Sequence, residues 1–349
     1  MPRSTEIRRS INMGICRKPS WSLTRQRTFS QCPRMGFFEY YSEGEPEAYL
    51  AWNLRELITL PMLVGEVVDL VIAAALKRVG RGENLPTDMA KVGIKTLDRF
   101  ISASPRLVQS MRQSARTAES RRSSPYKALL NDWYEIDQGA EYRNVLRGQV
   151  AVCLDTFENS EVVERIVEVE TASWGPFTRS MRTRPYFDLN GLRAYTSFDF
   201  YFRSGEDLFI LDWKSGIPSP VARESAEVQL DLYALYGAKV LGTQPDHIFK
   251  QAVWLRHSGA WAPIPVTAGS LEDAEKMALS QVDQERSRIN VSEIDGSYLA
   301  DRSLFPPVPS SSKCCFCKYR EICPEGTSAC KGLVTKGAIF GTSKSDCNV

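Results

Sequence analysis

Apolar residues recur at helical spacing over the first third of the chain. Between about Glu47 and Val79 they return every three or four positions, which is the period of an amphipathic helix. The stretch from about 80 to 125 continues this pattern, and Pro105 predicts a break within it. Residues 1 to about 20 are polar and basic and predict a poorly ordered tail.

The middle of the chain changes to the alternation that is typical of strands. Val162–Val169 alternates, and the runs Thr196–Arg203 and Leu208–Lys214 lie on either side of a short turn. The next predicted elements are a helix from about Arg223 to Val240, a hairpin of Phe249–Leu255 and Trp261–Val266, and a helix from about Leu271 to Ile289. Helices followed by strands, a helix and further strands predict an α/β fold with a mixed central sheet.

Composition narrows the class of protein. The 349 residues are 43% hydrophobic and 25% charged, as in an ordinary globular protein of one elaborated domain or two domains. No apolar run reaches the length of a membrane span, and the basic N-terminus lacks the apolar segment of a secretory signal, so we expect a cytoplasmic protein. Because the net charge is only +2, a nucleic-acid surface would require segregated charge.

Basic residues are concentrated in the helical stretch 80–125. Arg112 and Arg116 are one helical turn apart and therefore share a face. This face is either a surface that contacts DNA phosphates or simply a solvated one, and the sequence favours neither.

The strongest local pattern is a predicted hairpin around Gly205-Glu206. A two-residue turn that begins with glycine places Asp199 opposite Asp212 on one face, and Lys214 follows two residues later on that face. The same register pairs apolar residues on the other face: Phe202 with Phe209, Phe200 with Leu211, and Phe198 with Trp213.

Two facing carboxylates repel each other unless a cation lies between them. A hard divalent cation such as Mg²⁺ takes oxygen ligands, and Lys214 would be placed to orient an attacking water or to neutralise developing charge. The alternative, equally open from the hairpin alone, is that Asp199, Asp212 and Lys214 form an ion-paired patch on a solvent-facing sheet.

These residues resemble the core of the RecB-like PD-(D/E)XK nucleases. The resemblance lies in Phe-Asp199-Phe-Tyr, Ile-Leu-Asp212-Trp213-Lys214-Ser-Gly and Gln229-x-x-x-Tyr233. It implies a restriction-endonuclease-like core with a mixed sheet flanked by helices and an N-terminal helical insertion. It further implies that Asp199, Asp212 and the Trp213 carbonyl bind Mg²⁺ or Mn²⁺, and that Lys214, Gln229 and Tyr233 complete the catalytic site.

The chain departs from this family at one metal ligand. The family usually has Gly-x-x-x-His upstream, and the matching segment here is Gly65-Glu-Val-Val-Asp69. Asp69 is an oxygen ligand that could replace the histidine, and Glu66 is a weaker candidate. The alternative is that Asp69 only marks the polar edge of a helix.

Five of the nine cysteines are concentrated near the C-terminus, which in a reducing compartment indicates metal binding more than cross-linking. Cys314-x2-Cys317-x5-Cys323 supplies three ligands, and the spacing suits zinc and a [4Fe–4S] cluster equally. Cys315 could compete as a metal ligand, and Cys330 is an additional cysteine that the set of ligands does not require. For Cys16, Cys153 and Cys347 a buried or free thiol is favoured.

A second resemblance concerns the N-terminal cysteine. Phe29-Ser-Gln-Cys32-Pro-Arg, followed by Phe37-Phe-Glu-Tyr-Tyr41, resembles the cysteine motif of CRISPR-associated and AddB-type nucleases. The resemblance implies a structural [4Fe–4S] cluster, with Zn²⁺ as the alternative, on Cys32, Cys314, Cys317 and Cys323. Such a C-terminal iron–sulfur tail would join both ends of the chain.

The expected organisation is a basic tail at 1–20, a mainly helical region at 21–160, the nuclease core at 161–300 and the cysteine-rich tail at 301–349. The expected function is a Mg²⁺- or Mn²⁺-dependent deoxyribonuclease, as an exonuclease acting on single- or double-stranded DNA ends, in repair, CRISPR adaptation or phage defence. No phosphate-binding motor motif occurs, so a helicase, integrase or other subunit could be a partner. The alternative is a catalytically inactive scaffold subunit that binds DNA ends.

Overall fold

The computed structural model describes residues 13–16, 20–117, 124–137, 139–175, 184–292 and 298–334, and it divides into two compact units. Unit 1 comprises residues 1–59, 103–137 and 280–349, and unit 2 comprises residues 60–102 and 138–279. These units are built from separate stretches of chain, whereas the sequence suggested consecutive segments. One boundary falls inside helix α6 (Met89–Thr117).

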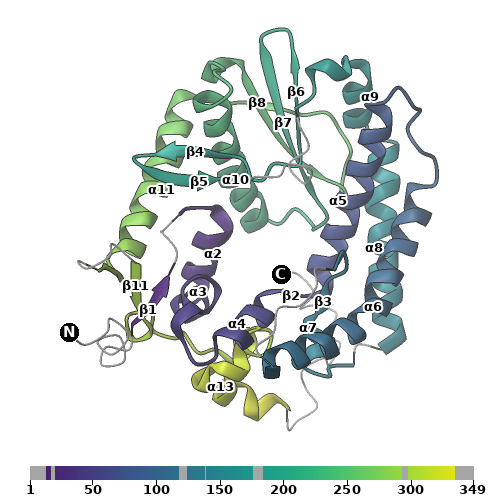
Figure 1. Cartoon of the computed structure of the whole chain (residues 1–349). Coiled ribbons are helices and arrows are strands. Elements are labelled where there is room, and N and C mark those ends of the chain that lie inside the picture. Colours follow the sequence, from purple (N-terminus) through teal and green to yellow (C-terminus); the bar gives the residue numbers. More distant parts are fainter. Residues whose placement is uncertain are drawn as a thin grey trace. The chain divides into compact units, whose positions relative to one another are not determined.

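The central sheet of unit 2 is mixed, as expected. Its strand order is β6-β7-β8-β9, in which β7 runs antiparallel to β6 and parallel to β8, while β9 is antiparallel to β8 (Figure 1). The strands are β6 (Phe200–Ser204), β7 (Asp207–Lys214), β8 (Ile248–Trp254) and β9 (Ile264–Pro265).

The β6–β7 hairpin has the register that the sequence predicts. Phe202 pairs with Phe209 and Phe200 with Leu211 across a turn at Gly205. Gly205 has φ +61°, and no positive φ occurs at the residue after it, which is the pattern of a type II′ turn. The ladder ends at Phe200, so the preceding residues approach β7 without strand pairing.

Helix α10 (Pro220–Lys239) connects the parallel strands β7 and β8 and packs against both (Figure 1). Ser219 caps the helix by accepting from the Ala222 amide at 3.2 Å, and proline at the first position suits a helix start. Gly237 allows close packing on the sheet, because a Cβ there would lie 2.8 Å from the Leu208 side chain. Helix α10 therefore covers the face of β7 on which Ile210 and Asp212 are buried.

Helices α5 (Leu60–Val79) and α8 (Gly139–Glu158) pack against each other in unit 2. The Phe157 ring of α8 meets the Trp213 ring of β7 edge-on, with ring centroids 5.3 Å apart. Trp213 and Asp212 point to opposite faces of the strand, so β7 is buried on both sides.

Two secondary-structure predictions were wrong. Val162–Val169, predicted as a strand, lies largely in helix α9 (Glu161–Glu168), because Ser160 caps it by accepting from the Val163 amide at 3.1 Å. Pro105, predicted to break a helix, lies inside α6. Buried residues on both sides of Pro105, such as Phe100 and Val108, supply packing that offsets the cost of about 3 kcal/mol of an interior proline.

A second hairpin in unit 2 was missed. It consists of β4 (Tyr186–Leu189) and β5 (Leu192–Tyr195), joined by Asn190-Gly191. These two residues have φ +52° and +77°, as a type I′ turn requires. An Asn-Gly pair is the strongest short-range hairpin signal, so the sequence did contain the information.

Unit 1 is mainly helical, with an aromatic core that includes the fully buried side chains of Phe37, Tyr41, Phe305 and Tyr319. Its helices include α2 (Leu23–Gln31), α3 (Pro33–Tyr40), α4 (Ala48–Arg55), α7 (Leu130–Trp133), α12 (Ser311–Cys314) and α13 (Pro324–Val334). Strands β2 (Leu57–Ile58) and β3 (Ala128–Leu129) form a short parallel pair.

A three-stranded sheet in unit 1 pairs residues 13–16 with residues that lie almost three hundred positions later in the sequence. Its order is β1-β11-β10, from β1 (Met13–Cys16), β11 (Tyr298–Asp301) and β10 (Ile289–Val291). The preceding helix, α11 (Ala268–Arg286), matches the predicted helix at Leu271–Ile289. The boundary between residues 279 and 280 falls inside this helix. Within the described residues, no helix is long and apolar enough to cross a membrane.

Candidate functional site

The two carboxylates predicted to face each other meet at the end of the β6–β7 hairpin in unit 2. Asp199 lies in a bend just before β6, and its Oδ2 accepts a hydrogen bond from the Trp213 backbone N–H at 2.8 Å. This bond fixes Asp199 beside Asp212, which is only 3% exposed. Helix α10 packs on this strand, so Asp212 does not lie on a solvent-facing sheet surface.

Lys214 is held by both its own strand and the following helix. Its Nζ lies 2.5 Å from Asp212 Oδ2 and donates to Gln229 Oε1 at 2.9 Å. The Gln229 amide nitrogen donates in turn to Asp212 Oδ1 at 3.3 Å and to Tyr233 Oη at 2.5 Å. The Tyr233 hydroxyl donates to the Ser197 carbonyl oxygen at 2.6 Å, so one network joins α10 to both arms of the hairpin.

Asp69 reaches the same region from α5. At Gly65, one turn earlier on the helix, a Cβ would lie 3.3 Å from Ser215 Oγ, so α5 approaches the end of β7 closely. Burial raises the pKa of the Asp199 carboxyl well above its usual range, and the neighbouring charges of Asp212 and Asp69 raise it further. The Trp213 hydrogen bond and the Lys214 charge act in the opposite direction. The charge of Asp69 therefore acts on the Asp199 carboxyl together with that of Asp212.

The chemistry of these donors suits a hard divalent cation. Carboxylate and carbonyl oxygens are the ligands that Mg²⁺ and Mn²⁺ prefer, and positive charge would relieve the repulsion that raises the pKa of Asp199. In the part of the chain that the structure describes, no group of three or more His, Cys, Asp or Glu side chains is already arranged to hold a metal ion. Glu66, the weaker candidate, is half-buried on α5.

The four predicted cluster cysteines are all in unit 1. Cys32 lies between α2 and α3 and caps both helices, Cys314 ends α12, and Cys317 and Cys323 lie between α12 and α13. Burial raises the pKa of the Cys317 thiol to about 11, and Cys32, Cys314 and Cys323 contribute to the same shift. Three of these sulfurs also interact with backbone N–H groups. The Ser310 N–H donates to the Cys314 sulfur at 3.3 Å. The Tyr319 N–H interacts with the Cys317 sulfur, and the Gly326 N–H with the Cys323 sulfur.

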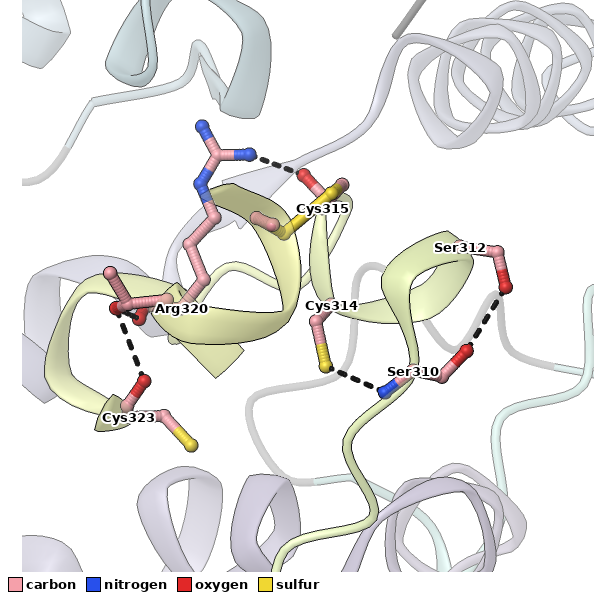
Figure 2. Close-up of a disulfide and its surroundings, with 8 residues drawn as sticks. Ser310, Ser312, Cys314, Cys315, Arg320 and Cys323 are labelled. Atoms are coloured by element: carbon pink, nitrogen blue, oxygen red, sulfur yellow. Dashed lines mark hydrogen bonds between the residues drawn. A yellow bond between two sulfur atoms is a disulfide. The ribbon is translucent and has the colours of Figure 1, made fainter. Parts of the chain in front are cut away.

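The remaining tail cysteines are paired with each other. Cys315 and Cys330 form a disulfide, so in this structure neither is the competing or spare ligand considered from the sequence. Figure 2 shows the sulfur atoms of Cys314 and Cys323 directed away from this disulfide. Cys153 is buried, which raises the pKa of its thiol to about 12. The side chain of Cys16 and all of Cys347 lie outside the described residues.

Arg112, one of the two arginines considered for DNA binding, is engaged within unit 1. It donates to the Trp133 carbonyl, pairs with Glu135 at 3.2 Å, and its guanidinium lies 5.4 Å from the Trp133 ring centroid. These contacts favour a structural role. The side chain of Arg116 lies outside the described residues.

A different basic face of α6 was not singled out from the sequence. Lys91, Lys95 and Arg99 are exposed and follow one another at intervals of one helical turn in unit 2. The four-residue spacing of these basic residues is the sequence pattern that could have identified this face. Where the structure describes their surroundings, these three side chains form no ion pair.

The chain as a whole matches one family of known proteins. A search of curated proteins found no match to the chain. The family model of the PD-(D/E)XK nuclease superfamily matches residues 20–324, which include the β6–β7 hairpin, Gln229 and Tyr233, and the segments of Cys32 and Cys323. This match covers most of the chain, and the mixed sheet with flanking helices agrees with it. The chain therefore belongs to the PD-(D/E)XK nuclease superfamily.

Proposed function

We propose that this protein is a metal-dependent deoxyribonuclease that hydrolyses phosphodiester bonds as an exonuclease at DNA ends. The observation that carries the proposal is the half-buried Asp199, which the Trp213 backbone N–H holds beside Asp212 and next to a lysine that is fixed by Gln229. The charge of Asp69 acts on the same carboxyl. Asp69, Asp199, Asp212 and the Trp213 carbonyl would hold Mg²⁺ or Mn²⁺. A divalent cation there would polarise the scissile phosphate and make a water molecule more acidic.

The protein's own side chains position the reacting groups. Lys214 is restrained from two sides, by Asp212 and by Gln229, so its ammonium is preorganised to orient the water and to stabilise the charge that develops on the phosphate. Gln229 uses both ends of its amide, and Tyr233 anchors it to the Ser197 carbonyl. The network therefore fixes the lysine before substrate arrives, which lowers the cost of ordering it.

For the DNA backbone we propose the exposed face of Lys91, Lys95 and Arg99 on α6 rather than Arg112. Successive positions on this face are about 6 Å apart along the helix axis, and their charges are not neutralised by ion pairs among the described residues. A polyanion would bind such a row with release of counterions, and its affinity would fall with salt concentration.

For the cysteines we propose a [4Fe–4S] cluster on Cys32, Cys314, Cys317 and Cys323, with Zn²⁺ as the alternative. The backbone N–H groups that face three of the sulfurs support this proposal, because such hydrogen bonds stabilise metal-bound thiolates. The cluster would be structural and would join the N-terminal and C-terminal segments of unit 1.

The proposed function is tested by incubating anaerobically purified protein with end-labelled single- and double-stranded DNA in Mg²⁺, Mn²⁺ or EDTA. We expect cleavage only with metal, and a loss of activity of about 100-fold or more in the Lys214→Ala protein. Lys239→Ala is the matched control, because Lys239 pairs with Glu275 at 2.9 Å on the same unit's surface. Equal activity of the two variants would contradict the assignment of Lys214.

A catalytically inactive scaffold that binds DNA ends is the second candidate, because Asp69 stands where relatives usually carry a histidine. Protein that retains its metal cluster and binds DNA ends but never cleaves them would support the scaffold. Activity that appears only on addition of a helicase or integrase subunit would instead support an enzyme that requires a partner.

A further inference from the structure

The missed β4–β5 hairpin has one buried and one exposed face. Phe187, Leu189, Leu192 and Ala194 are buried on the inner face, and β4 contacts helix α10 (Figure 1). The outer face therefore consists of two directly opposed pairs: Tyr186 with Tyr195, and Asp188 with Arg193. Tyr186 is 44% exposed, although most tyrosines of this chain are more deeply buried.

The two tyrosines and the arginine of the outer face contact one another. The rings of Tyr186 and Tyr195 have centroids 5.8 Å apart, and the Arg193 guanidinium lies 5.0 Å from the Tyr186 ring centroid. Tyr195, two residues further along β5 on the same face, raises the pKa of the Arg193 guanidinium. Asp188, opposite Arg193, uses its Oδ1 to accept from the Gly191 amide in the turn, at 3.0 Å. The outer face thus presents two aromatic rings and an arginine, while the Asp188 carboxylate is engaged at the turn.

The chain leads directly from this hairpin into the candidate active site. Tyr195 ends β5, and Asp199 follows only four residues later. The intervening segment is fixed, because the Thr196 amide donates to the Pro185 carbonyl at 3.0 Å and the Ser197 carbonyl accepts from Tyr233. At about 3.5 Å per residue, the Cα atoms of Tyr195 and Asp199 are at most about 14 Å apart, a span of a few nucleotides.

We propose that Tyr186, Arg193 and Tyr195 form a stacking platform for the bases of single-stranded DNA beside the catalytic carboxylates. Unpaired bases expose their faces and stack on aromatic side chains, while an arginine adds cation–π and phosphate contacts. The bases of a duplex are already stacked on each other and cannot use such a surface. The platform therefore selects a single strand, and its place beside Asp199 rests on the proposed nuclease function.

The platform is tested by binding measurements in the Lys214→Ala background, which avoids cleavage. The probes are a fluorescein-labelled 20-nucleotide dT strand, an abasic strand of the same length and charge, and a 20-base-pair duplex. We expect the Tyr186→Ala/Tyr195→Ala change to weaken dT binding about tenfold or more. Binding of the abasic strand and of the duplex should change less than about twofold.

Three controls separate stacking from charge and from folding. Tyr49→Ala removes a tyrosine of similar exposure, 49%, on α4 and should leave dT binding unchanged. Tyr186→Phe/Tyr195→Phe keeps the rings and should restore it. Equal losses on dT and the abasic strand, or unchanged dT binding, would overturn the platform. A different outcome is that the wild-type protein fails to cleave DNA, while the double alanine variant still loses affinity for dT only. That result would contradict the proposed nuclease activity and leave the platform standing.

Discussion

At the scale of single residues, Gln229 and Tyr233 explain why Lys214 has one defined position. Tyr233 is 6% exposed, and its hydroxyl is both acceptor for Gln229 and donor to the Ser197 carbonyl. Tyr233→Phe removes both partners at once. We expect a loss of about 1–2 kcal/mol in the free energy of unfolding and about a tenfold fall in DNA cleavage, measured by urea denaturation and by end-labelled substrate.

The matched control for this change lies on the same helix. Tyr236 is 9% exposed and packs on Phe198, but its hydroxyl makes no hydrogen bond within the described part of the chain. Tyr236→Phe should therefore alter neither stability nor activity by a comparable amount. Similar losses in both variants would show that the ring environment, rather than the hydroxyl network, determines the effect.

A second prediction at this scale concerns His247. A hydrogen bond between its Nδ1 and Asp207 Oδ1, at 2.8 Å, raises the pKa of the imidazole above its usual value of about 6.5. The folded state thus favours the protonated imidazole. The stabilisation of the fold by protonated His247 is therefore fully present below pH about 6.5 and is lost as the pH rises through the raised pKa. His247→Gln should lower stability at pH 5.5 more than at pH 8.5 in thermal unfolding. A difference independent of pH would contradict this assignment.

At the scale of elements, the approach of α5 to the end of β7 decides whether Asp69 reaches the site. Gly65 permits that approach, because a Cβ would already lie 3.3 Å from Ser215 Oγ. Gly65→Val adds a branched side chain at this contact and should displace α5, and with it Asp69. We expect DNA cleavage to fall by about tenfold or more, measured at saturating Mn²⁺.

Gly148 provides the control for helical glycines. It lies in α8, and a Cβ at this position would have no neighbour within 4 Å. Gly148→Ala should therefore raise the free energy of unfolding by about 0.5–1 kcal/mol and leave cleavage unchanged. If Gly65→Val retained full activity, the proposed role of α5 in placing Asp69 would be wrong.

At the scale of the whole molecule, the cysteines connect segments that are distant in sequence. Cys32 belongs to the N-terminal helices and Cys317 to the C-terminal segment, and both lie in unit 1. We expect Cys32→Ala and Cys317→Ala to lose bound iron or zinc, measured by elemental analysis, and to unfold at lower temperature, since the centre closes a very long loop. Cys153→Ala, which removes a buried thiol of unit 2, should retain the metal. Full metal content in all three variants would exclude these ligands.

The part of the site that the sequence predicted depends on local, periodic geometry. Strand side chains alternate with a period of two, and a glycine-first turn fixes which residues face each other. The juxtaposition of Asp199, Asp212 and Lys214 therefore follows from the order of residues in the hairpin. The four-residue spacing of Gln229 and Tyr233 likewise places both on one helix face, and both side chains are turned toward Lys214 and the hairpin.

Other features depended on contacts between residues distant in sequence. A short apolar run such as Val162–Val169 fits a strand or a helix equally well, and the cap at Ser160 with its buried neighbours decided for the helix. Pro105 stays helical because of packing around it, and Arg112 pairs with Glu135 and contacts Trp133 within unit 1.

The sequence by itself determined the superfamily and the register of the β6–β7 hairpin, because both depend on the order and spacing of neighbouring residues. Only the tertiary structure showed that the Asp69 charge acts on the Asp199 carboxyl, that Cys315 pairs with Cys330, and that the β4–β5 hairpin presents its tyrosines outward. Each of these depends on which surfaces become buried when the chain folds, and burial is a property of the assembled elements rather than of any one segment.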